Sequence, residues 1–457
     1  MGLFQIMRSA SITLSSFQLA SEITGDNIAN VQTKGYVRQK VIFQENPSYP
    51  SPYGGIGTGV RPKEIKRIID MFVENQVEKE TSIKTYWDEK TNYYQLIERI
   101  LQEPSDTNIN GLLNNFWSAL KELSINPESI SLREHVLNVA QVLIDRFHYT
   151  YRGLKDQKDY LNYNISQIND QINLLSQQLA KINEKIIGYP VVERIANELK
   201  NEQDRIIRQL SELFKVNVIR NDDGTVNVYI GGSTLVIRNK KFEIEAIPDV
   251  DGDYYLYWEL TGERVNFTSG KIKSWFDLRD EIIPDYINKI DNLAYNLVTE
   301  INNIHVLGYG LDNSTGNNFF EPLVGVTDAS LNIKLDPSIT AEKISASDAP
   351  NEPGNNKNLL NIINLKNQQI FGLGNTTFEE YYQGIISQLS KESSSSQSIQ
   401  NSQNLLLQSI QKIWESISGV NLDEEVAYLL QYQYAYQAAA KVISVTSELI
   451  ETLLKIY

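Results

Sequence analysis

Residues that could carry out chemistry are few and widely spaced in this chain. The histidines are His135, His148 and His305; no two of them are four residues apart, and no His-Glu-x-x-His motif occurs. A helical zinc site of the protease type needs such a pair. The absence of cysteine excludes disulfides, thiolate catalysis and cysteine-ligated zinc. We therefore expect no metal site and predict that the histidines are ordinary surface or core residues.

Two short segments have a superficial likeness to ligand-binding loops. Residues 249–253, Asp-Val-Asp-Gly-Asp, have glycine at the fourth position, whereas an EF-hand calcium loop needs glycine at the sixth and glutamate at the twelfth. The glycines of residues 54–59 match neither the dinucleotide fingerprint nor the Walker loop, and no Lys-Ser or Lys-Thr follows them. We predict a hairpin turn at the first segment, a surface loop at the second and no cofactor.

The charged residues do not define an active site. Paired carboxylates perform glycosidase chemistry, but in a chain with 57 Asp and Glu residues such a pair has no diagnostic value. The net charge of −15 argues against a nucleic-acid partner, because phosphate binding needs clustered Lys and Arg. No apolar run is long enough to span a bilayer, and serines interrupt the N-terminal apolar pattern, so we expect neither a membrane partner nor a cleavable signal. No catalytic residue is assigned, and the chain is not expected to be an enzyme.

Apolar heptads at the two ends of the chain are the strongest pattern in the sequence. At the N-terminus the heptads run from Leu3 to Val31 and stop at Lys34-Gly35, where glycine suits a helix cap. At the C-terminus they begin at Leu422, and a second apolar line runs beside them. A helix that is apolar over most of its circumference must bury more than one face. We therefore predict that these helices pack against other molecules and not only within their own fold.

The interior changes from helical to strand periodicity and back. Heptads from Leu154 to Ile186, stopping near Gly188-Tyr189-Pro190, predict a long helix. Alternating residues and two Asp-Gly turns predict strands from Val216 to Leu260. Residues Ser393–Ser396 are expected to form a polar loop or the start of a helix.

The predicted fold class is mainly α with inserted β. We expect an elongated rod whose terminal helices form a coiled-coil-like pair, with a central helical bundle and a small antiparallel β domain. The predicted segments are 1–37 and 422–457 (the two halves of a terminal helical domain), 38–213, 271–307 and 359–421 (three parts of a helical domain), 214–270 (an inserted antiparallel β domain) and 308–358 (an irregular or β excursion).

Two stretches resemble the terminal motifs of the axial flagellar proteins, the family of rod, hook and hook-associated subunits. They are DNIANVQTKGYVRQ, residues 26–39, and NLDEEVAYLLQYQYAYQAAAKVISVTSELIETLL, residues 421–454. Interior stretches such as GIGTGVRPKEIKRIIDMFVENQV and KSWFDLRDEIIPDYINKIDNLAYNLVTEINNIH are similar to the hook-associated members of that family. The likeness has gaps at 235–270 and 308–400.

The resemblance implies a structural, homo-oligomeric subunit of the bacterial flagellum that assembles as a layer at the hook–filament junction after type III export. Implied partners are further copies of the chain, the hook protein on the proximal side, the second junction protein on the distal side and an export chaperone on the C-terminal segment. The chain would be cytoplasmic before export and extracellular afterwards. Alternatives are another axial subunit (hook or distal rod) and, from a different class, a flagellum-attached peptidoglycan hydrolase.

Residues of the two terminal segments are assigned to an assembly interface. They are Leu3, Met7, Leu14, Phe17, Asn27, Ile28, Asn30, Gly35, Tyr36, Leu429, Tyr436, Ala440, Ile443, Ile450 and Leu454. Among them, the two asparagines, the glycine and Tyr36 are expected to form the end of the N-terminal helix and the turn after it. The second C-terminal apolar line is assigned to the chaperone: Val426, Leu430, Tyr434, Val442 and Leu449.

Overall fold

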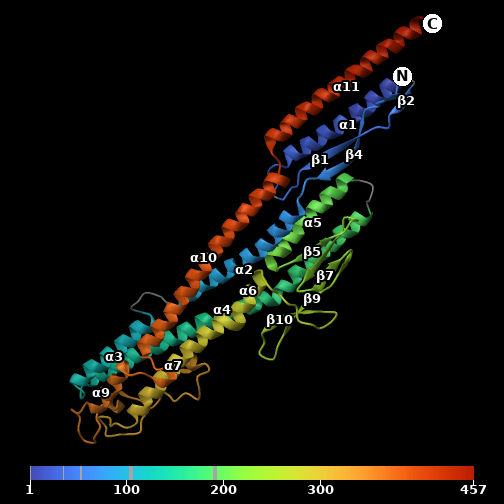
Figure 1. Ribbon diagram of the computed structural model, residues 1–457. Coiled ribbons are helices and arrows are strands. Elements are labelled where there is room, and N and C mark those ends of the chain that lie inside the picture. The colour runs from blue at the N-terminus through green and yellow to red at the C-terminus, as the bar shows by residue number, and fades with distance from the viewer. Residues whose placement is uncertain (1, 34, 52–53, 102–106, 189–192, 457) are drawn as a thin grey trace.

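The molecule is an elongated rod with both chain ends at the same end of the rod (Figure 1). The computed structural model describes residues 2–33, 35–51, 54–101, 107–188 and 193–456. From the paired terminal helices the chain runs to the far end of the rod and returns, so the middle of the sequence forms the body. This arrangement confirms the predicted fold class. Within the described residues, no helix combines the length and the apolar character that crossing a membrane requires.

Helices make up most of the rod. The α-helices are α1 (Leu3–Ala29), α2 (Met71–Leu101), α3 (Ile109–Ile125), α4 (Ile130–Gly188), α5 (Glu193–Leu213), α6 (Lys271–Asp277), α7 (Ile283–His305), α8 (Ala329–Asn332), α9 (Lys357–Asn364), α10 (Phe378–Ser418) and α11 (Leu422–Ile456). A π-helical turn, η1 (Leu278–Ile282), joins α6 to α7. Short 3-10 turns are η2 (Ala341–Lys343), η3 (Leu365–Asn367) and η4 (Phe371–Leu373).

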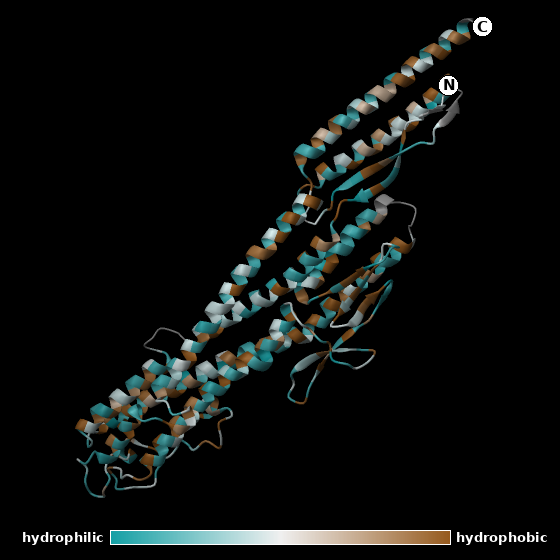
Figure 2. Ribbon diagram, in the orientation of Figure 1, coloured by the Kyte–Doolittle hydropathy of each residue, from teal (hydrophilic) through white to brown (hydrophobic). Residues whose placement is uncertain are grey.

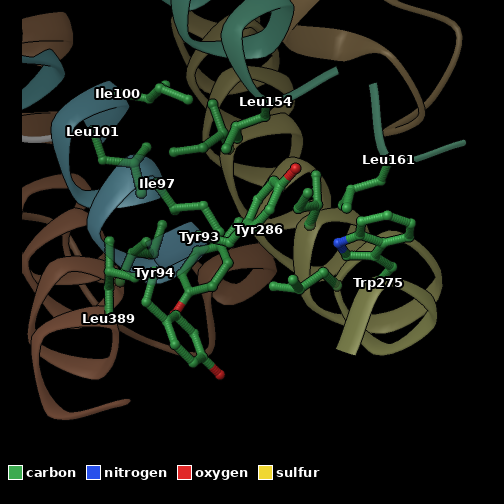
Figure 3. Packing of buried hydrophobic residues seen from close by; sticks show 14 of the residues in the cluster. Tyr93, Tyr94, Ile97, Ile100, Leu101, Leu154, Leu161, Trp275, Tyr286 and Leu389 are labelled. Atoms are coloured by element: carbon green, nitrogen blue, oxygen red, sulfur yellow. The ribbon is translucent and has the colours of Figure 1, made fainter. Parts of the chain in front are cut away.

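The body is a bundle in which α2 pairs with α10 while α4 packs on α3, α5 and α7. The heptads that predicted a long helix lie in α4, which ends at Gly188; Tyr189 and Pro190 lie outside the described residues. Side chains from α2, α4, α6, α7 and α10 converge on one continuous core (Figure 3). Within it, the Tyr286 hydroxyl donates to Glu392 Oε2 at 3.0 Å. Burial of side chains from helices far apart in the sequence therefore holds the rod together.

The serine run of α10 lies inside this bundle. Ser393 and Ser396 are buried, and the Ser396 hydroxyl is 2.6 Å from the hydroxyl of Thr91 on α2. Small side chains here let the two helix backbones approach closely. The prediction of a polar loop or helix start at Ser393–Ser396 is therefore wrong, because the segment lies well inside α10.

Short antiparallel sheets flank the helices. The strands are β1 (Gln39–Glu45), β2 (Tyr49–Ser51), β3 (Gly54–Ile56), β4 (Val60–Arg67), β5 (Asn217–Arg220), β6 (Val226–Ile230), β7 (Ser233–Ile237), β8 (Lys240–Lys241), β9 (Ile244–Pro248) and β10 (Tyr254–Trp258). Strands β5 to β8 form one sheet in sequence order, and β9 pairs with β10. Both predicted Asp-Gly turns are confirmed: Gly224 links β5 to β6 and Gly252 links β9 to β10, each with φ of +83°.

Strands also occur where the sequence predicted helix. The segment 38–213 begins with the antiparallel pair β1 and β4, and β2 pairs with β3 between them. The pairing of Gln39 with Arg67 sets the register, which shifts once at a bulge between Ile42 and Phe43. The sequence of β4, VRPKEIKR, is mostly charged and contains proline, so it lacks the alternation that marks a strand. The other predicted segment boundaries stay predictions.

At the far end of the rod, polar side chains hold the irregular segment 308–358. His305 is fully buried; its Nδ1–H donates to the carbonyl of Asn317 at 2.7 Å, and its Nε2 accepts the backbone N–H of Ser345 at 3.0 Å. These contacts need a neutral ring. The pKa of His305 is lowered to about 4, mainly by burial and also by nearby Arg133, while the hydrogen bond to Asn317 and the charge of Asp336 oppose the shift.

We expect acid to weaken this end of the rod through His305. As the pH falls below 6.5, His305 becomes protonated in the unfolded chain, whereas in the folded chain it stays neutral down to about pH 4. The free energy of unfolding therefore falls as the pH falls from 6.5 to about 4. Between pH 7 and pH 5 the loss should be about 2 kcal/mol, since one pKa unit is worth about 1.4 kcal/mol. Urea unfolding at both pH values measures it. His305→Gln should be less stable at pH 7 but lose less on acidification; an equal loss in both proteins would contradict this account.

Candidate assembly interface

The terminal helices α1 and α11 pair antiparallel, so that the end of α1 lies beside the start of α11 (Figure 1). The residues of α1 that become buried are Ala10, Ser16, Ala20, Ile23, Thr24 and Asn27. Those of α11 are Glu425, Tyr432, Ala439 and Thr446, one every seven residues. A heptad line of mostly small or polar residues thus forms the contact within one copy.

The predicted apolar line lies beside this contact and not at its centre. Half-buried members are Leu3, Met7, Leu14, Phe17, Ile28, Leu429, Ala440, Ile443 and Ile450, whereas Tyr436 and Leu454 are exposed. Part of the line expected to meet other molecules is therefore covered by the chain's own partner helix. These contact residues were not predicted from the sequence, because only heptads of apolar side chains were considered. The contact residues of α11 repeat every seven positions as Glu, Tyr, Ala and Thr, so the repeat is recognised only if polar residues are included.

The hairpin of β1 and β4 covers one side of the helix pair. Phe17 of α1, Phe43 of β1 and Tyr432 of α11 form an aromatic cluster with ring centroids 5.6 to 6.3 Å apart. Gly59, at the start of β4, has φ of +86°, and a Cβ there would stand 2.6 Å from Thr13 Oγ1 of α1. Only glycine allows this close approach. The head of the rod is therefore a three-part unit of α1, α11 and the hairpin.

Asn27 joins the three parts. Its side chain is buried, and its Nδ2 donates to the Gln39 carbonyl at 2.8 Å and to Glu425 Oε2 at 2.9 Å. Its Oδ1 accepts the Gln39 N–H and the Tyr36 hydroxyl, both at 3.0 Å. Two donors and two acceptor positions exhaust what one amide can offer. Asn27 therefore links α1 to the turn, to β1 and to α11 at one point.

The other predicted turn residues follow α1, which ends at Ala29 with Asn30 as its cap, so the predicted helix cap at Gly35 is wrong. Asn30 is half-buried, and its Nδ2 donates to the Asp26 carbonyl within the same helix end. Gly35 has φ of +83°, and a Cβ there would stand 3.2 Å from the Arg208 guanidinium. Burial raises the pKa of Glu425, while its hydrogen bond to Asn27 acts in the opposite direction. Their role in assembly stays a prediction.

Buried ionic contacts join the body helices to one another, and one of them reaches the hairpin. Glu74 of α2 is fully buried and accepts two hydrogen bonds from Arg208 of α5, each 3.0 Å long, and one from Trp414 of α10. Nearby, Asp204 of α5 pairs with Arg67 of β4. A buried charge that loses its partner is strongly destabilising. The Arg67–Asp204 pair therefore helps to fix where the hairpin of the terminal unit lies on the bundle.

Hydrophobic residues occur along the whole of α11 (Figure 2), and many of their side chains are exposed. All five residues assigned to the chaperone are exposed: Val426, Leu430, Tyr434, Val442 and Leu449. The C-terminal end of α11 projects beyond the N-terminus of α1 (Figure 1), and both Leu453 and Leu454 are exposed there. Scattered exposed leucines are ordinary on a protein surface, but a continuous apolar line marks a contact surface.

The segments considered for ligand chemistry have structural roles. Asp249 Oδ1 accepts the backbone N–H groups of Asp251 and Asp253, each at 2.9 Å, as a turn between β9 and β10. The glycine-rich segment 54–59 supplies β3 and the connection to β4. Among the residues that the structure describes, no three His, Asp or Glu side chains are grouped so as to hold a metal ion.

Comparison with known families and proteins gives consistent matches. The family model described as "Flagellar hook-associated protein FlgK helical domain" matches residues 94–320, and "Flagellar basal body rod FlgEFG protein C-terminal" matches residues 415–456. The flagellar hook-associated protein 1 of Bacillus subtilis (strain 168) is 26% identical over 98% of this chain and 97% of its own length. That of Salmonella typhimurium is 23% identical over 99% of both chains.

The fold agrees with these matches. The structure described as the flagellar hook junction protein FlgK from Burkholderia pseudomallei superposes with a TM-score of 0.65 at 13% identity, over 75% of this chain and 100% of that one. At that identity the likeness speaks for the fold. With sequence relatives that match from end to end, a family model in the helical body and another over α11, the chain is similar over its whole length to the flagellar hook-associated protein 1 family.

Proposed function

We propose that this chain is a structural subunit of the bacterial flagellum that assembles as a layer at the hook–filament junction. The observation that carries the proposal is the terminal unit: α1 and α11 are paired within one copy, yet α11 keeps a continuous exposed apolar line. Relatives that match from end to end bear the name flagellar hook-associated protein 1. A structural role needs no catalytic residue, and we propose that the chain is not an enzyme.

The physical basis of assembly is burial of apolar side chains between copies. Burying one Leu- or Ile-sized side chain contributes about 1.5 to 3 kcal/mol, and the exposed line of α11 offers several of them. A single neighbour covers only one side of a helix that is apolar around most of its circumference. Stability therefore rises as neighbours accumulate on several sides, which makes assembly cooperative.

The exposed line also accounts for the proposed partners. Before export, an uncovered apolar helix would invite aggregation, so we propose that a cytoplasmic chaperone covers Val426, Leu430, Tyr434, Val442 and Leu449. After type III export the same helix would meet further copies, the hook protein on the proximal side and the second junction protein on the distal side. The predicted interface residues of α1 and α11 are the proposed contacts in that layer.

A hook or rod subunit is the nearest alternative, because the model that matches residues 415–456 describes rod-type C-terminal segments. The helical-domain match over residues 94–320 and the end-to-end relatives favour the hook-associated role. No observation favours a peptidoglycan hydrolase.

Localisation and deletion test the function. We expect cells that lack the chain to make hooks without filaments, because the filament has no junction layer to grow on, and expression of the chain to restore filaments. Immunogold labelling should place the chain at the distal tips of hooks. Labelling along the hook or within the basal rod would instead assign it to the alternative.

Asn27→Ala should impair the terminal unit without unfolding the body. It leaves the Gln39 backbone, Tyr36 and Glu425 without their shared partner, and each buried group that stays unpaired costs about 1 to 3 kcal/mol. We expect far fewer filaments per cell and an unchanged urea midpoint for the body. Asn292→Ala in α7 is the matched control, because its exposed amide donates only to the Asn288 carbonyl of the same helix and the residue lies outside the terminal unit. Equal filament numbers for the two variants would remove Asn27 from its proposed role.

Leu430→Glu should weaken chaperone binding. The side chain is 48% exposed, so the substitution should leave the fold intact while placing a charge in the apolar line. We expect at least a tenfold loss of affinity for the export chaperone of the same host, measured by calorimetry with full-length chain. Gln431→Glu, one residue away and also exposed, should bind like the wild type. If both variants bind equally well, the chaperone recognises another surface.

A further inference from the structure

Helix α10 carries an exposed seam that the core of the bundle does not use. The seam consists of three large apolar residues that recur every seven positions, Ile399, Leu406 and Ile413. Three serines, Ser402, Ser409 and Ser416, alternate with them at intervals of three and four residues. All six side chains are exposed. We call these six residues the α10 seam. The face that packs on α2 is a different one, formed by residues such as Leu407, Ile410 and Trp414. The spacing is that of a coiled-coil contact line without its partner.

The serines of the α10 seam make it suitable for close helix packing. The Ser402 hydroxyl donates to the Ser398 carbonyl at 2.9 Å, and the Ser416 hydroxyl donates to the Ile413 carbonyl at 2.8 Å. These hydroxyl hydrogens are satisfied within the helix, so covering them costs little. Large Ile and Leu side chains between small Ser side chains form the knobs and spaces that a second helix can fill.

Most of the seam lies in a stretch of α10 without charged residues, and Lys412 and Glu415 flank its last two members. No Asp, Glu, Lys or Arg occurs from Ser393 to Gln411, although charged residues make up 22% of the chain. Depletion of charge is the compositional mark of the centre of a protein interface. It also favours a second copy as the occupant: each copy has a net charge of −15, so two copies repel each other, and the uncharged stretch of α10 adds no carboxylate to a contact between them.

A second line of exposed apolar side chains lies on another side of the body. The exposed members of this line on α4 are Val142, Tyr149, Tyr160, Tyr163 and Leu174. Their spacings of seven, eleven, three and eleven residues are close to whole turns of a helix, so they lie on one side of α4. We call them the α4 stripe. Within the described residues α10 packs mainly on α2, α7 and α3, whereas α4 packs on α3, α5 and α7. Tyrosine is enriched where proteins bind one another.

We infer that the α10 seam of one copy packs on the α4 stripe of a second copy. Both helices run along the rod from the far end toward the terminal unit (Figure 1), so side-by-side rods of the same orientation bring them parallel. A contact between two different surfaces is heterologous and can continue around a closed or helical layer, unlike a two-fold contact that ends at a dimer. The inference rests on the proposed function and adds the surface by which the bodies of neighbouring copies meet.

Disulfide cross-linking tests the contact directly, because the chain has no cysteine of its own. Each of Ser402→Cys, Ser409→Cys and Ser416→Cys is combined with each of Tyr149→Cys, Tyr160→Cys and Leu174→Cys, and the full chain is expressed in cells that lack the native copy. Mild oxidation of isolated hooks should give a ladder of dimers and larger species with at least one pair, and none with either cysteine alone. A dimer from an α10 cysteine alone would overturn the pairing, because it would mean that seam meets seam.

Charge placed in the seam provides the second test. Leu406→Glu with Ile413→Glu should reduce filaments per cell at least tenfold, while secretion of the chain stays at the wild-type level. Gln408→Glu lies on another side of α10 and should have no effect. The inference is overturned if the chain is labelled at hook tips, no cysteine pair gives cross-linked species, and the Glu variant makes normal filaments. The proposed function would still hold in that case. Absence of every variant and of the unmodified chain from hook tips would instead overturn the proposed function.

Discussion

The antiparallel pairing of α1 with α11 is the constraint on which the rest of the structure depends. It brings the two ends of a 457-residue chain together, so everything between them must run out along the rod and return. Asn27 fixes this pairing because one buried amide bonds to the turn, to β1 and to α11 at once. The ion pair between Arg67 of β4 and Asp204 of α5 then links the hairpin of the terminal unit to the bundle. The orientation of the terminal unit thus depends on a few polar contacts, while the bundle depends on a large apolar core.

The division of residue types between the inside and the outside of the terminal unit explains how it can serve assembly. The contact within one copy uses residues such as Ser16, Ala20 and Thr446, whose burial contributes little hydrophobic free energy. The larger apolar residues of α11, among them Leu449 and Leu453, are left outside. A unit built in this way is weak alone and gains most of its stability from neighbours. The same distribution would be a fault in a protein that worked as a monomer.

Much of the fold could be predicted from periodicity, and the failures have identifiable causes. The heptads from Leu154 to Ile186 and the two Asp-Gly turns gave the long helix and the hairpins, because each signal is local and repeated. Strands β1 and β4 were missed because their stability comes from packing on α1 and α11, which no local pattern records. The contact line of α11 was placed beside its true position because Glu425 and Thr446 are polar, and their burial depends on partners such as Asn27 that are distant in sequence. The apolar residues assigned to an interface lie on α1 and α11, and their role in assembly stays a prediction.

Charge connects the behaviour of the free chain to that of the layer. A net charge of −15 keeps copies apart in solution, and the same repulsion opposes their packing at high local concentration. Neutralising the whole surface would remove this repulsion but would also remove the protection against wrong contacts. An uncharged stretch on one helix, residues 393–411 of α10, reduces that conflict, because a second copy can approach there without desolvating a charged group of α10. Under the proposed arrangement, charge repulsion favours one orientation of neighbouring rods. Rods that meet in another alignment bring carboxylates together. Rods that meet seam to stripe do so where α10 has no charged residue from Ser393 to Gln411.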